Sequence, residues 1–290
     1  MIKNNKIRTN KNNLILSTAI GYQWKDLKIF IKSLRKVSRD RVIFIVDENL
    51  DKKTKDKLNF YDIETHHYLK NNLTNKNNYK NLKQIIAQKR YEMYEIVLNN
   101  LKNKPKKILL TDSRDVVFQS NIFKNKFKEP LNFFLEKEKI LNDTRNTRWL
   151  TRTVGIEKFE RIKHKLISCS GTTLGNYNEI IKYTNLMKKN LHLFPYKRPL
   201  RHVISFKKKD TGFDQGIHNY LIHNNFFKDK ECHYNDLSAI CTTAYMKKFI
   251  FNKKKQLINK KGDVYSIIHQ YDRCFKADGS SFFNFRDIYE

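Results

Sequence analysis

The sequence predicts an α/β protein with a central, mostly parallel sheet flanked by helices. Short, continuous apolar runs recur along the first 120 residues, and segments with apolar side chains at helical spacing lie between them. This alternation is typical of parallel strands joined by crossover helices, because such strands are covered on both faces. Hydrophobic residues fill 39% of the 290 positions and include 20 Phe and 15 Tyr, enough for a substantial core.

The first half of the chain supplies most of the predicted sheet. Apolar runs predict strands at residues 14–21, 42–46, 63–68 and 106–110. Helical spacing predicts helices at residues 24–34, 51–58 and 86–101, the second of them capped by Asp51. Residues 70–81 are mostly Asn and Lys, which indicates a solvated loop, and residues 1–12 are typical of a loose basic tail.

The second half is more irregular. Residues 124–165 are predicted to be helical and basic, and residues 166–168 to form a short strand that leads into Gly171. Further helices are predicted at residues 177–187 and 213–221, separated by a long loop at residues 192–211. The remainder is predicted to form short strands with turns at Gly262 and Gly279. No internal repeat and no linker divides the sequence, so we expect a single domain over residues 1–290.

The charge of the chain is strongly positive. Lys and Arg number 59 against 29 Asp and Glu, a formal net charge of +30. Such a field favours anionic partners, namely nucleic acid, anionic lipid headgroups or phosphorylated substrates. The abundance of Lys, Asn, Ile, Phe and Tyr is also what an AT-rich genome encodes, and we take that bias as the main source of the charge.

The sequence gives no sign of a membrane span or a disulfide framework. No apolar stretch approaches the ~18 residues that a spanning helix needs. The run 14–20 contains Ser17 and Thr18 and lacks a small-residue cleavage site, so it indicates a buried strand rather than a signal peptide. The four cysteines have no zinc or redox spacing and are expected to be reduced thiols in a cytosolic setting. The segment 232–241, with two Cys and one His, lacks the second close pair of a zinc site.

The stretch TDSRDVVFQ, residues 111–119, carries the strongest functional signal. It directly follows a predicted strand, and parallel strands deliver functional residues at their carboxyl ends. Asp112 and Asp115 lie three residues apart there, with Ser113 and Arg114 between them. Two carboxylates on a short turn can hold one hard cation, which can in turn bind a diphosphate. Acids also cap turns after strands, but the paired placement favours a metal site.

Several residues elsewhere in the sequence are candidates for the same site as this turn. Four of the eight glycines fall in two short segments, 168–175 and 212–216, where tight turns or close approach of a ligand are expected. Asp214 opens a predicted helix, either as its cap or as a group that bonds a sugar hydroxyl or acts as a base. His269 follows an apolar run, and a metal that takes N and O ligands would give it a role.

Two residues of the first half are further candidates. Arg90 falls on the apolar stripe of its helix, where it is either a snorkelling surface side chain or a fork that holds phosphate. Asp47 ends the clearest predicted strand and is expected to meet the ribose or base of a nucleotide.

Four segments in this order resemble the glycosyltransferases with the GT-A fold. Residues 112–119 read D-x-R-D-V-x-F-Q and resemble their DxD-type metal motif, and residues 168–175 resemble the segment that lines the donor-sugar pocket. Asp214-Gln215-Gly216 resembles the DQ motif of the glycogenin-like galactosyltransferases, and residues 268–273 resemble the late His segment that completes the metal shell. The likeness runs from about Leu14 to Arg273. The acids are separated by two residues rather than one, which leaves open whether Asp112 or Asp115 is the main ligand.

The resemblance implies a GT-A domain with a nucleotide-binding half at residues 13–125 and an acceptor-side half at residues 126–290. It implies Mn²⁺ or Mg²⁺ held by Asp112, Asp115 and His269, with a nucleotide-diphosphate sugar bound through the metal. Donor contacts are expected from Asp47, Arg90, Asp112, Ser113, Gly171 and Thr172. Asp214 is expected to be catalytic, facing the donor sugar or the acceptor. One of the loops 70–81 and 192–211 is expected to order over the substrates.

The implied activity is transfer of a sugar to a glycan or glycolipid on the cytosolic side, and the late motifs favour retention of configuration. The positive charge suggests peripheral contact with anionic membrane. A nucleic-acid-binding protein without catalysis is the main alternative, but the basic residues are scattered and no RNP, KH or zinc-finger signature is present. A sugar-1-phosphate nucleotidyltransferase is a further alternative, although residues 17–22 contain one Gly instead of a Gly-rich phosphate loop.

Overall fold

A computed structural model of the chain describes residues 10–68, 82–194 and 212–274, together with residues 280, 283–285 and 289. The predicted loop 70–81, residues 195–211 of the second loop and the turn at Gly279 lie outside the described residues. The expectation that one loop orders over the substrates therefore stays a prediction.

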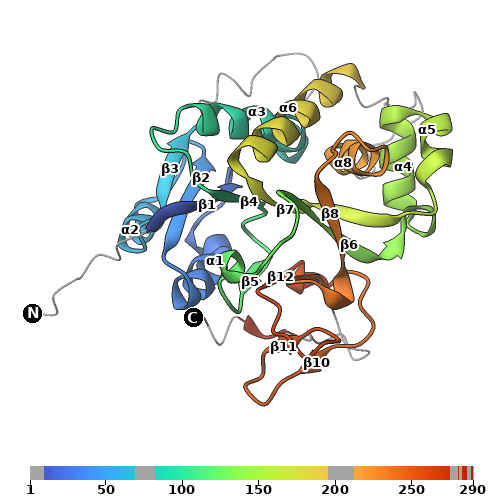
Figure 1. Ribbon diagram of the computed structural model, residues 1–290. Helices are drawn as coiled ribbons and strands as arrows, with labels where there is room; N and C mark the ends of the chain where they lie inside the picture. The colour runs from blue at the N-terminus through green and yellow to red at the C-terminus, as the bar shows by residue number, and fades with distance from the viewer. Residues whose placement is uncertain are drawn as a thin grey trace, which may run out of the picture.

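A seven-stranded sheet forms the centre of the molecule, with strand order β3-β2-β1-β4-β7-β6-β8 (Figure 1). Its strands are β1 (Asn10–Thr18), β2 (Asp40–Val46), β3 (Glu64–His67), β4 (Lys107–Thr111), β6 (Leu131–Lys139), β7 (Leu166–Asn176) and β8 (Lys230–Tyr234). β7 runs antiparallel to both of its neighbours, and the other adjacent strands pair in parallel. The predicted α/β class with a mostly parallel sheet is confirmed.

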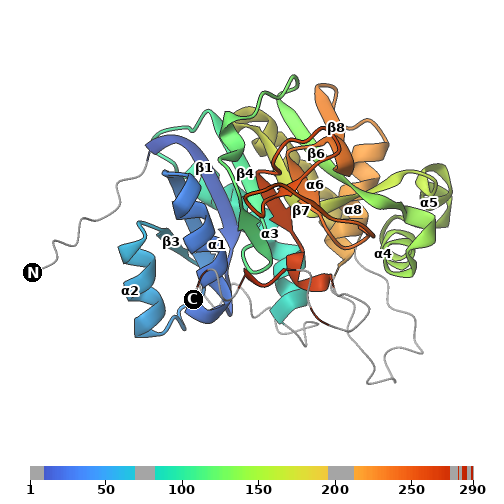
Figure 2. The same cartoon turned by 90° about the horizontal axis from the view of Figure 1, so that it is seen from below.

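Helices cover both faces of this sheet (Figures 1 and 2). On one face lie α1 (Trp24–Val37) and α2 (Lys52–Phe60), and on the other lie α3 (Leu82–Asn99), α6 (Tyr177–Leu193) and α8 (Phe213–His223). Helices α4 (Thr144–Val154) and α5 (Ile156–Ile162) pack beside α8. Because side chains alternate along a strand, Leu14 and Leu16 join the core under α3, whereas Ile15 joins the core under α1.

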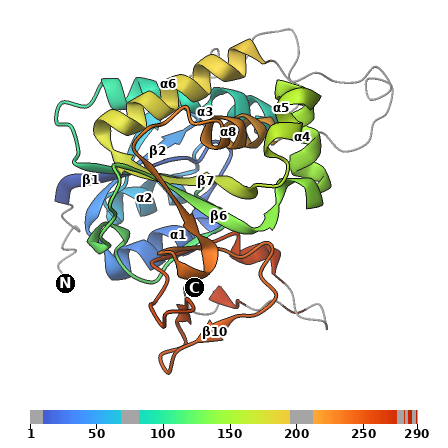
Figure 3. The same cartoon turned by 45° about the vertical axis from the view of Figure 1, so that its right-hand side comes forward.

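Two small sheets, built mainly from the C-terminal part of the chain, lie on the α1 side of the molecule (Figure 3). One has the order β5-β12-β9 and consists of β5 (Val116–Phe118), β9 (Ile240–Thr242) and β12 (Ile267–His269). The other is a hairpin of β10 (Ile250–Phe251) and β11 (Leu257–Ile258). Short 3₁₀ turns lie at η2 (Ile122–Lys124), η3 (Ile140–Asn142), η4 (Asn235–Leu237) and η5 (Tyr271–Arg273).

The prediction of a helical segment at residues 124–165 is wrong for its first part. Residues 131–139 form β6, which pairs with β7 on one side and β8 on the other, and only α4 and α5 are α-helical there. Pairing with neighbouring strands on both edges, which the local sequence does not reveal, makes this segment a strand instead of a helix. The short strand predicted at 166–168 extends to Asn176 for the same reason, because β4 pairs with residues 172–176 and β6 pairs with residues 173–175 and with Ser168 and Leu166. The predicted cap is confirmed, since the Asp51 side chain accepts a hydrogen bond from the Thr54 N–H at 2.5 Å.

The central sheet takes β1 to β4 from the predicted nucleotide-binding half and β6 to β8 from the predicted acceptor-side half. Among the helices that the structure describes, none combines the length and the apolar character that crossing a membrane requires.

Candidate metal and nucleotide site

The site lies where the order of the parallel strands reverses. From β1 the chain adds β2 and β3 on one side and then returns to place β4 on the other side of β1. A crevice forms at the carboxyl ends of strands at such a point, and ligands of α/β proteins bind there. Ser113 closes the gap between the two strands, because its Oγ donates a hydrogen bond to the Thr18 carbonyl oxygen at 2.9 Å.

A cavity of about 330 Å³ opens at this point. It is lined by the ends of β1 and β4 and by residues of α3, α4, β6, β7, α8 and η5. Its charged lining residues are Arg90, Asp112, Arg114, Asp115, Glu136, Arg145, Asp214 and Arg273. Carboxylates and guanidinium groups in equal number therefore face one concave space.

Asp112 and Asp115 of the DSRD turn line this cavity, and the fully buried His269, which is not itself a lining residue, lies beside them. These three side chains are called the metal wall below. One potential ligand atom from each of Asp112, Asp115 and His269 lies within 4.8 Å of the other two. His269 Nε2 is 3.4 Å from Asp112 Oδ2 and 3.9 Å from Asp115 Oδ1. The predicted convergence of the three side chains is confirmed, although about 155 residues of chain separate the acids from the histidine.

Backbone pairing sets this arrangement. β12 runs antiparallel to β5, which opposes His269 to Val116, and the N–H of Gln270 donates to the Asp115 carbonyl at 2.8 Å. On the other side, the Asp112 N–H donates to the Gly171 carbonyl at 2.9 Å. Gln270 has a left-handed φ of 60°, which turns the chain into η5. Arg273 Nη2 then returns to Asp115 Oδ2 at 3.0 Å.

Two features of these residues fit a bound cation. Neither ring nitrogen of the fully buried His269 makes a hydrogen bond within the described part of the chain. The nearest acceptor of Nε2, Asp112 Oδ2, is 3.4 Å away and badly placed for a hydrogen bond, so a metal ion between them would satisfy this nitrogen better. A Cβ at Gly171 would lie 2.5 Å from His269 Cε1 and 2.6 Å from Asp112 Oδ2, so glycine keeps the space in front of these groups open. Two carboxylates and an imidazole form a mixed O and N donor set.

The charged groups of the metal wall change one another's pKa values. Burial opposes ionisation of Asp112, yet His269 and Arg90 outweigh it and lower the pKa of the Asp112 carboxyl. Burial raises the pKa of Asp115, and the like charge of Asp112 adds to the rise. Burial disfavours a charged His269, but Cys169 and Asp112 raise its pKa well above the usual value. The wall therefore attracts positive charge, and a proton and a metal ion would compete for it.

Arg90 and Asp214 form a close ion pair in the same cavity. Arg90 Nη2 lies 2.5 Å from Asp214 Oδ2, and both side chains are less than one tenth exposed. The same guanidinium donates to Ser170 Oγ at 2.8 Å and lies 3.2 Å from Asp112 Oδ1. Arg90 is therefore buried rather than snorkelling, and both of its Nη atoms have acceptors. Burial raises the pKa of Asp214, although Arg90 opposes the rise.

The basic residues of the cavity differ from those of the chain as a whole. Of the 59 basic residues, 45 are Lys and 14 are Arg. The cavity is nevertheless lined by four Arg and, among the described residues, by no Lys. Compositional bias towards Lys cannot explain this selection. Planar guanidinium groups suit phosphate and carboxylate recognition better than ammonium groups do.

Asp47 and Thr172 lie outside the lining of the cavity. Asp47 Oδ2 accepts from the Gly21 N–H at 2.7 Å and its Oδ1 accepts from the Asn49 N–H at 2.9 Å, so this side chain orders the loop after β1. Thr172 is fully buried in β7, opposite Thr111 of β4. Ser113, Arg90, Gly171 and Asp214 do line the cavity.

The polar residues that follow Asp214 bond to the backbone of β7, and Gln215 also lines the cavity. The Gln215 Oε1 accepts from the Ser170 N–H at 2.8 Å, and the Asn219 Oδ1 accepts from the Ser168 N–H at 2.8 Å. β6 and β7 lose register beside Ser168, so α8 replaces part of the missing strand pairing. The segment 214–219 thus joins one buried acid to several structural side chains.

Sequence reasoning missed Glu136 altogether. It lies in β6, is 5% exposed and lines the cavity, and burial raises its pKa to about 7. Reading residues 131–136 as a buried strand with one acid at its end would have marked it. Trp149 and Arg145 of α4 and Tyr245 also line the cavity, but their sequence contexts carry no signal that separates them from surface residues.

No protein-family model and no curated protein sequence matches this chain. The assignment of a function therefore depends on the chemistry of the cavity.

Proposed function

We propose that this protein is a metal-dependent glycosyltransferase of the GT-A type, which moves a sugar from a nucleotide-diphosphate sugar to a glycan or glycolipid. The observation that carries the proposal is the meeting of Asp112, Asp115 and His269 at the point where the strand order reverses. That crevice is where an α/β sheet receives a nucleotide, and the three side chains offer ligands for a cation beside it.

Asp112, Asp115 and His269 would hold the ion. Their mixed O and N donors suit Mn²⁺ better than Mg²⁺, which is usually held by oxygen ligands alone. When bound, the ion would neutralise charge on the diphosphate as the leaving group departs. The arginines at positions 114, 145 and 273 supply further positive charge around the same space.

Gly171 would allow the donor to approach the metal wall closely, because any side chain there would overlap His269. Asp214 would contact a hydroxyl group of the donor sugar or of the acceptor. Its close pairing with Arg90 holds the carboxylate in place and opposes the rise in pKa that burial causes, so we assign it hydrogen bonding to a hydroxyl group. Substrate contacts of Asp47 and Thr172 form no part of the proposal.

A thermal-shift screen tests the proposal directly. UDP, GDP and their sugars are added with Mn²⁺ or with EDTA, and the melting temperature is recorded. A ligand that binds only the folded protein raises stability by about 2.7 kcal/mol at a concentration of 100 times its dissociation constant. We expect at least one nucleoside diphosphate to stabilise the protein more with Mn²⁺ than with EDTA.

The same screen can also contradict the proposal. If no nucleoside diphosphate shifts the melting curve under any metal condition, the donor assignment is wrong. Tight, steeply salt-dependent binding of nucleic acid together with that negative result would favour a nucleic-acid-binding protein instead.

A further inference from the structure

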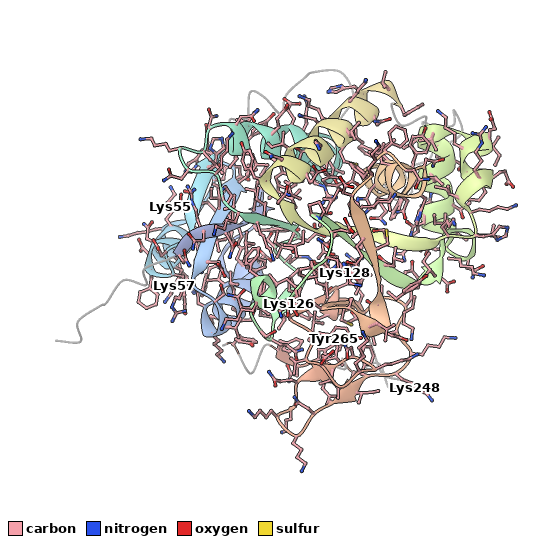
Figure 4. All side chains as sticks on the ribbon, in the orientation of Figure 1. Lys55, Lys57, Lys126, Lys128, Lys248 and Tyr265 are labelled. Atoms are coloured by element: carbon pink, nitrogen blue, oxygen red, sulfur yellow. The ribbon has the colours of Figure 1, made fainter. Side chains whose placement is uncertain are left out.

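Residues 247–261, the basic hairpin, concentrate positive charge on one projection of the molecule. They include seven lysines and no acidic residue. All seven lysines are exposed. Lys260 pairs with Asp236 at 2.7 Å, and no carboxylate pairs with the other six among the residues that the structure describes. Figures 1 and 3 show β10 and β11 extending away from the central sheet, and Figure 4 shows Lys248 at the outer margin of this part.

The tip of the hairpin is an ordered turn made of three consecutive lysines. Asn252 Oδ1 accepts from the N–H groups of Lys254 at 3.0 Å and Gln256 at 2.9 Å, which closes the turn. Lys255 has a left-handed φ of 59°, a conformation that favours Gly or Asn. A lysine therefore occupies a strained position at the tip, where a smaller residue would fit the backbone better.

Two large apolar side chains lie next to this tip. Ile250 is 52% exposed and Phe251 is 45% exposed. They do not reflect a loose hairpin, because the partner strand is firmly anchored. Leu257 is fully buried, and its backbone N–H and C=O both bond the Gln119 side chain, at 2.8 and 3.0 Å.

Exposed apolar side chains surrounded by lysines match the outer layer of an anionic membrane. Lysines attract lipid headgroups, and apolar side chains between them can enter the boundary with the acyl chains. Nucleic acid matches less well, because of these two exposed apolar side chains only Phe251 has a ring on which a base could stack. We propose that the basic hairpin docks the protein onto a bilayer that contains anionic lipid.

This surface is separate from the candidate active site, because no residue of 247–261 lines the cavity. The proposal therefore does not depend on the glycosyltransferase assignment, and either can fail alone.

Co-sedimentation with vesicles tests the docking surface. Vesicles of phosphatidylcholine alone are compared with vesicles that also contain phosphatidylglycerol. We expect the protein to bind the anionic vesicles and to be released by added salt. Replacing three lysines together (K253Q/K254Q/K255Q) should weaken binding on the order of a hundredfold, since each lysine near the surface contributes roughly a fivefold change. I250S/F251S should weaken it at least several-fold with all lysines retained.

A matched control separates location from net charge. K52Q/K53Q/K55Q removes the same charge from three exposed lysines of α2, where Figure 4 shows Lys55 on another side of the molecule. Melting curves check that all variants fold. Retention of vesicle binding by the α2 variant and its loss in the hairpin variants would support the proposal. Equal losses in both triple variants, no binding to anionic vesicles, or hairpin-dependent binding of nucleic acid without vesicle binding would each overturn it.

Discussion

His218 and His269 are both fully buried, yet they differ in what surrounds their ring nitrogens. His218 Nδ1 bonds the Tyr183 hydroxyl at 2.7 Å, and its Nε2 bonds Ser168 Oγ at 3.0 Å. Neither nitrogen of His269 has a hydrogen-bond partner within the described segments. Burial lowers the pKa of His218, and Arg90 lowers it further, whereas the neighbours of His269 raise its pKa.

The difference separates a structural histidine from a candidate ligand. A buried polar ring is stable when other groups satisfy it, and hydroxyls of the protein satisfy His218. His269 instead faces two carboxylates, so a cation from outside the protein would complete its surroundings. Changes near His269 should act on ligand binding, and changes near His218 should act on folding.

The largest effect is expected from Asp115→Asn. Replacing this carboxylate removes a charged ligand from the metal wall while the side chain keeps nearly the same shape. The sugar-transfer rate should fall on the order of a thousandfold or more, a loss of several kcal/mol of transition-state stabilisation. Initial rates with saturating Mn²⁺ measure the loss, and the Mn²⁺-dependent part of the nucleotide thermal shift should disappear with it.

His218→Phe should have the largest effect on folding. The ring contacts with Phe133 and Tyr183 allow a second aromatic ring, but the Ser168 and Tyr183 hydroxyls lose a partner. The free energy of unfolding should fall by about 2 to 4 kcal/mol in urea titrations, because buried groups without partners are costly. Adding Ser168→Ala removes one of the stranded hydroxyls, so the double variant should be less destabilised than the two single changes added together. A double variant that shows simple additivity would contradict the assigned hydrogen bond.

The contrast between the two histidines could not be read from the sequence. His218 stands in a helix and His269 ends a strand, but their partners come from remote segments: β7 and α6 for His218, and the turn after β4 for His269. Antiparallel pairing of β5 with β12 creates the second arrangement, and the local pattern does not specify which short strands pair. The resemblance of ordered motifs, rather than periodicity, linked His269 to Asp112 and Asp115.

The fold itself was more readable in its first half. β1, β2 and β4 each contain a continuous apolar run that helices cover on both faces, so their sequences carry a strong signal. The sequence does not predict β6, because its short apolar stretch 133–135 precedes the charged run EKEK, which suits an exposed helix equally well. Because β6 was not predicted, Glu136, the buried acid of the cavity, was not predicted either. A strand that forms mainly because it pairs with neighbours on both edges cannot be predicted from its own sequence, and neither can the functional residues on it.

Gly171→Ala should affect the metal wall by steric overlap. The added Cβ would lie 2.5 Å from a ring atom of the fully buried His269, so the ring or the strand would have to shift. We expect a loss of about 1 to 3 kcal/mol of unfolding free energy, typical of overpacking, together with loss of the Mn²⁺-dependent thermal shift.

Gly175→Ala is the matched control for this change. It lies in the same strand, and its Cβ would meet the Pro130 carbonyl oxygen at 2.9 Å, away from the cavity. It should destabilise the protein but leave the response to Mn²⁺ intact. If both alanine variants lose that response, general destabilisation and not the metal wall is the cause.

The pH dependence of stability should also report on His218. Its folded pKa is lowered well below the ordinary histidine value of about 6.5, so below pH 6.5 the unfolded chain binds a proton that the folded protein excludes. Stability from this group is complete above about pH 6.5 and is lost as pH falls, at about 1.4 kcal/mol per pH unit. Urea titrations of the wild type and of His218→Phe between pH 8 and pH 5 measure the slope. In the variant, the dependence of the unfolding free energy on pH should be smaller by the contribution of one proton. An unchanged slope would mean that His218 is not the group responsible.

Ser113→Ala should have the smallest effect. It tests whether the Ser113 hydroxyl takes part in ligand binding or only joins two strands. Ser113 lies between Asp112 and Asp115, but its Oγ donates to the Thr18 carbonyl and joins the ends of β4 and β1. Removing one neutral hydrogen bond should lower the free energy of unfolding by about 1 kcal/mol, and the transfer rate should change by less than about tenfold. Unfolding titrations and initial rates give the two numbers for one variant. A loss comparable to that of Asp115→Asn with unchanged stability would make the hydroxyl part of the ligand-binding group, since a group that only joins two strands affects folding before it affects the reaction.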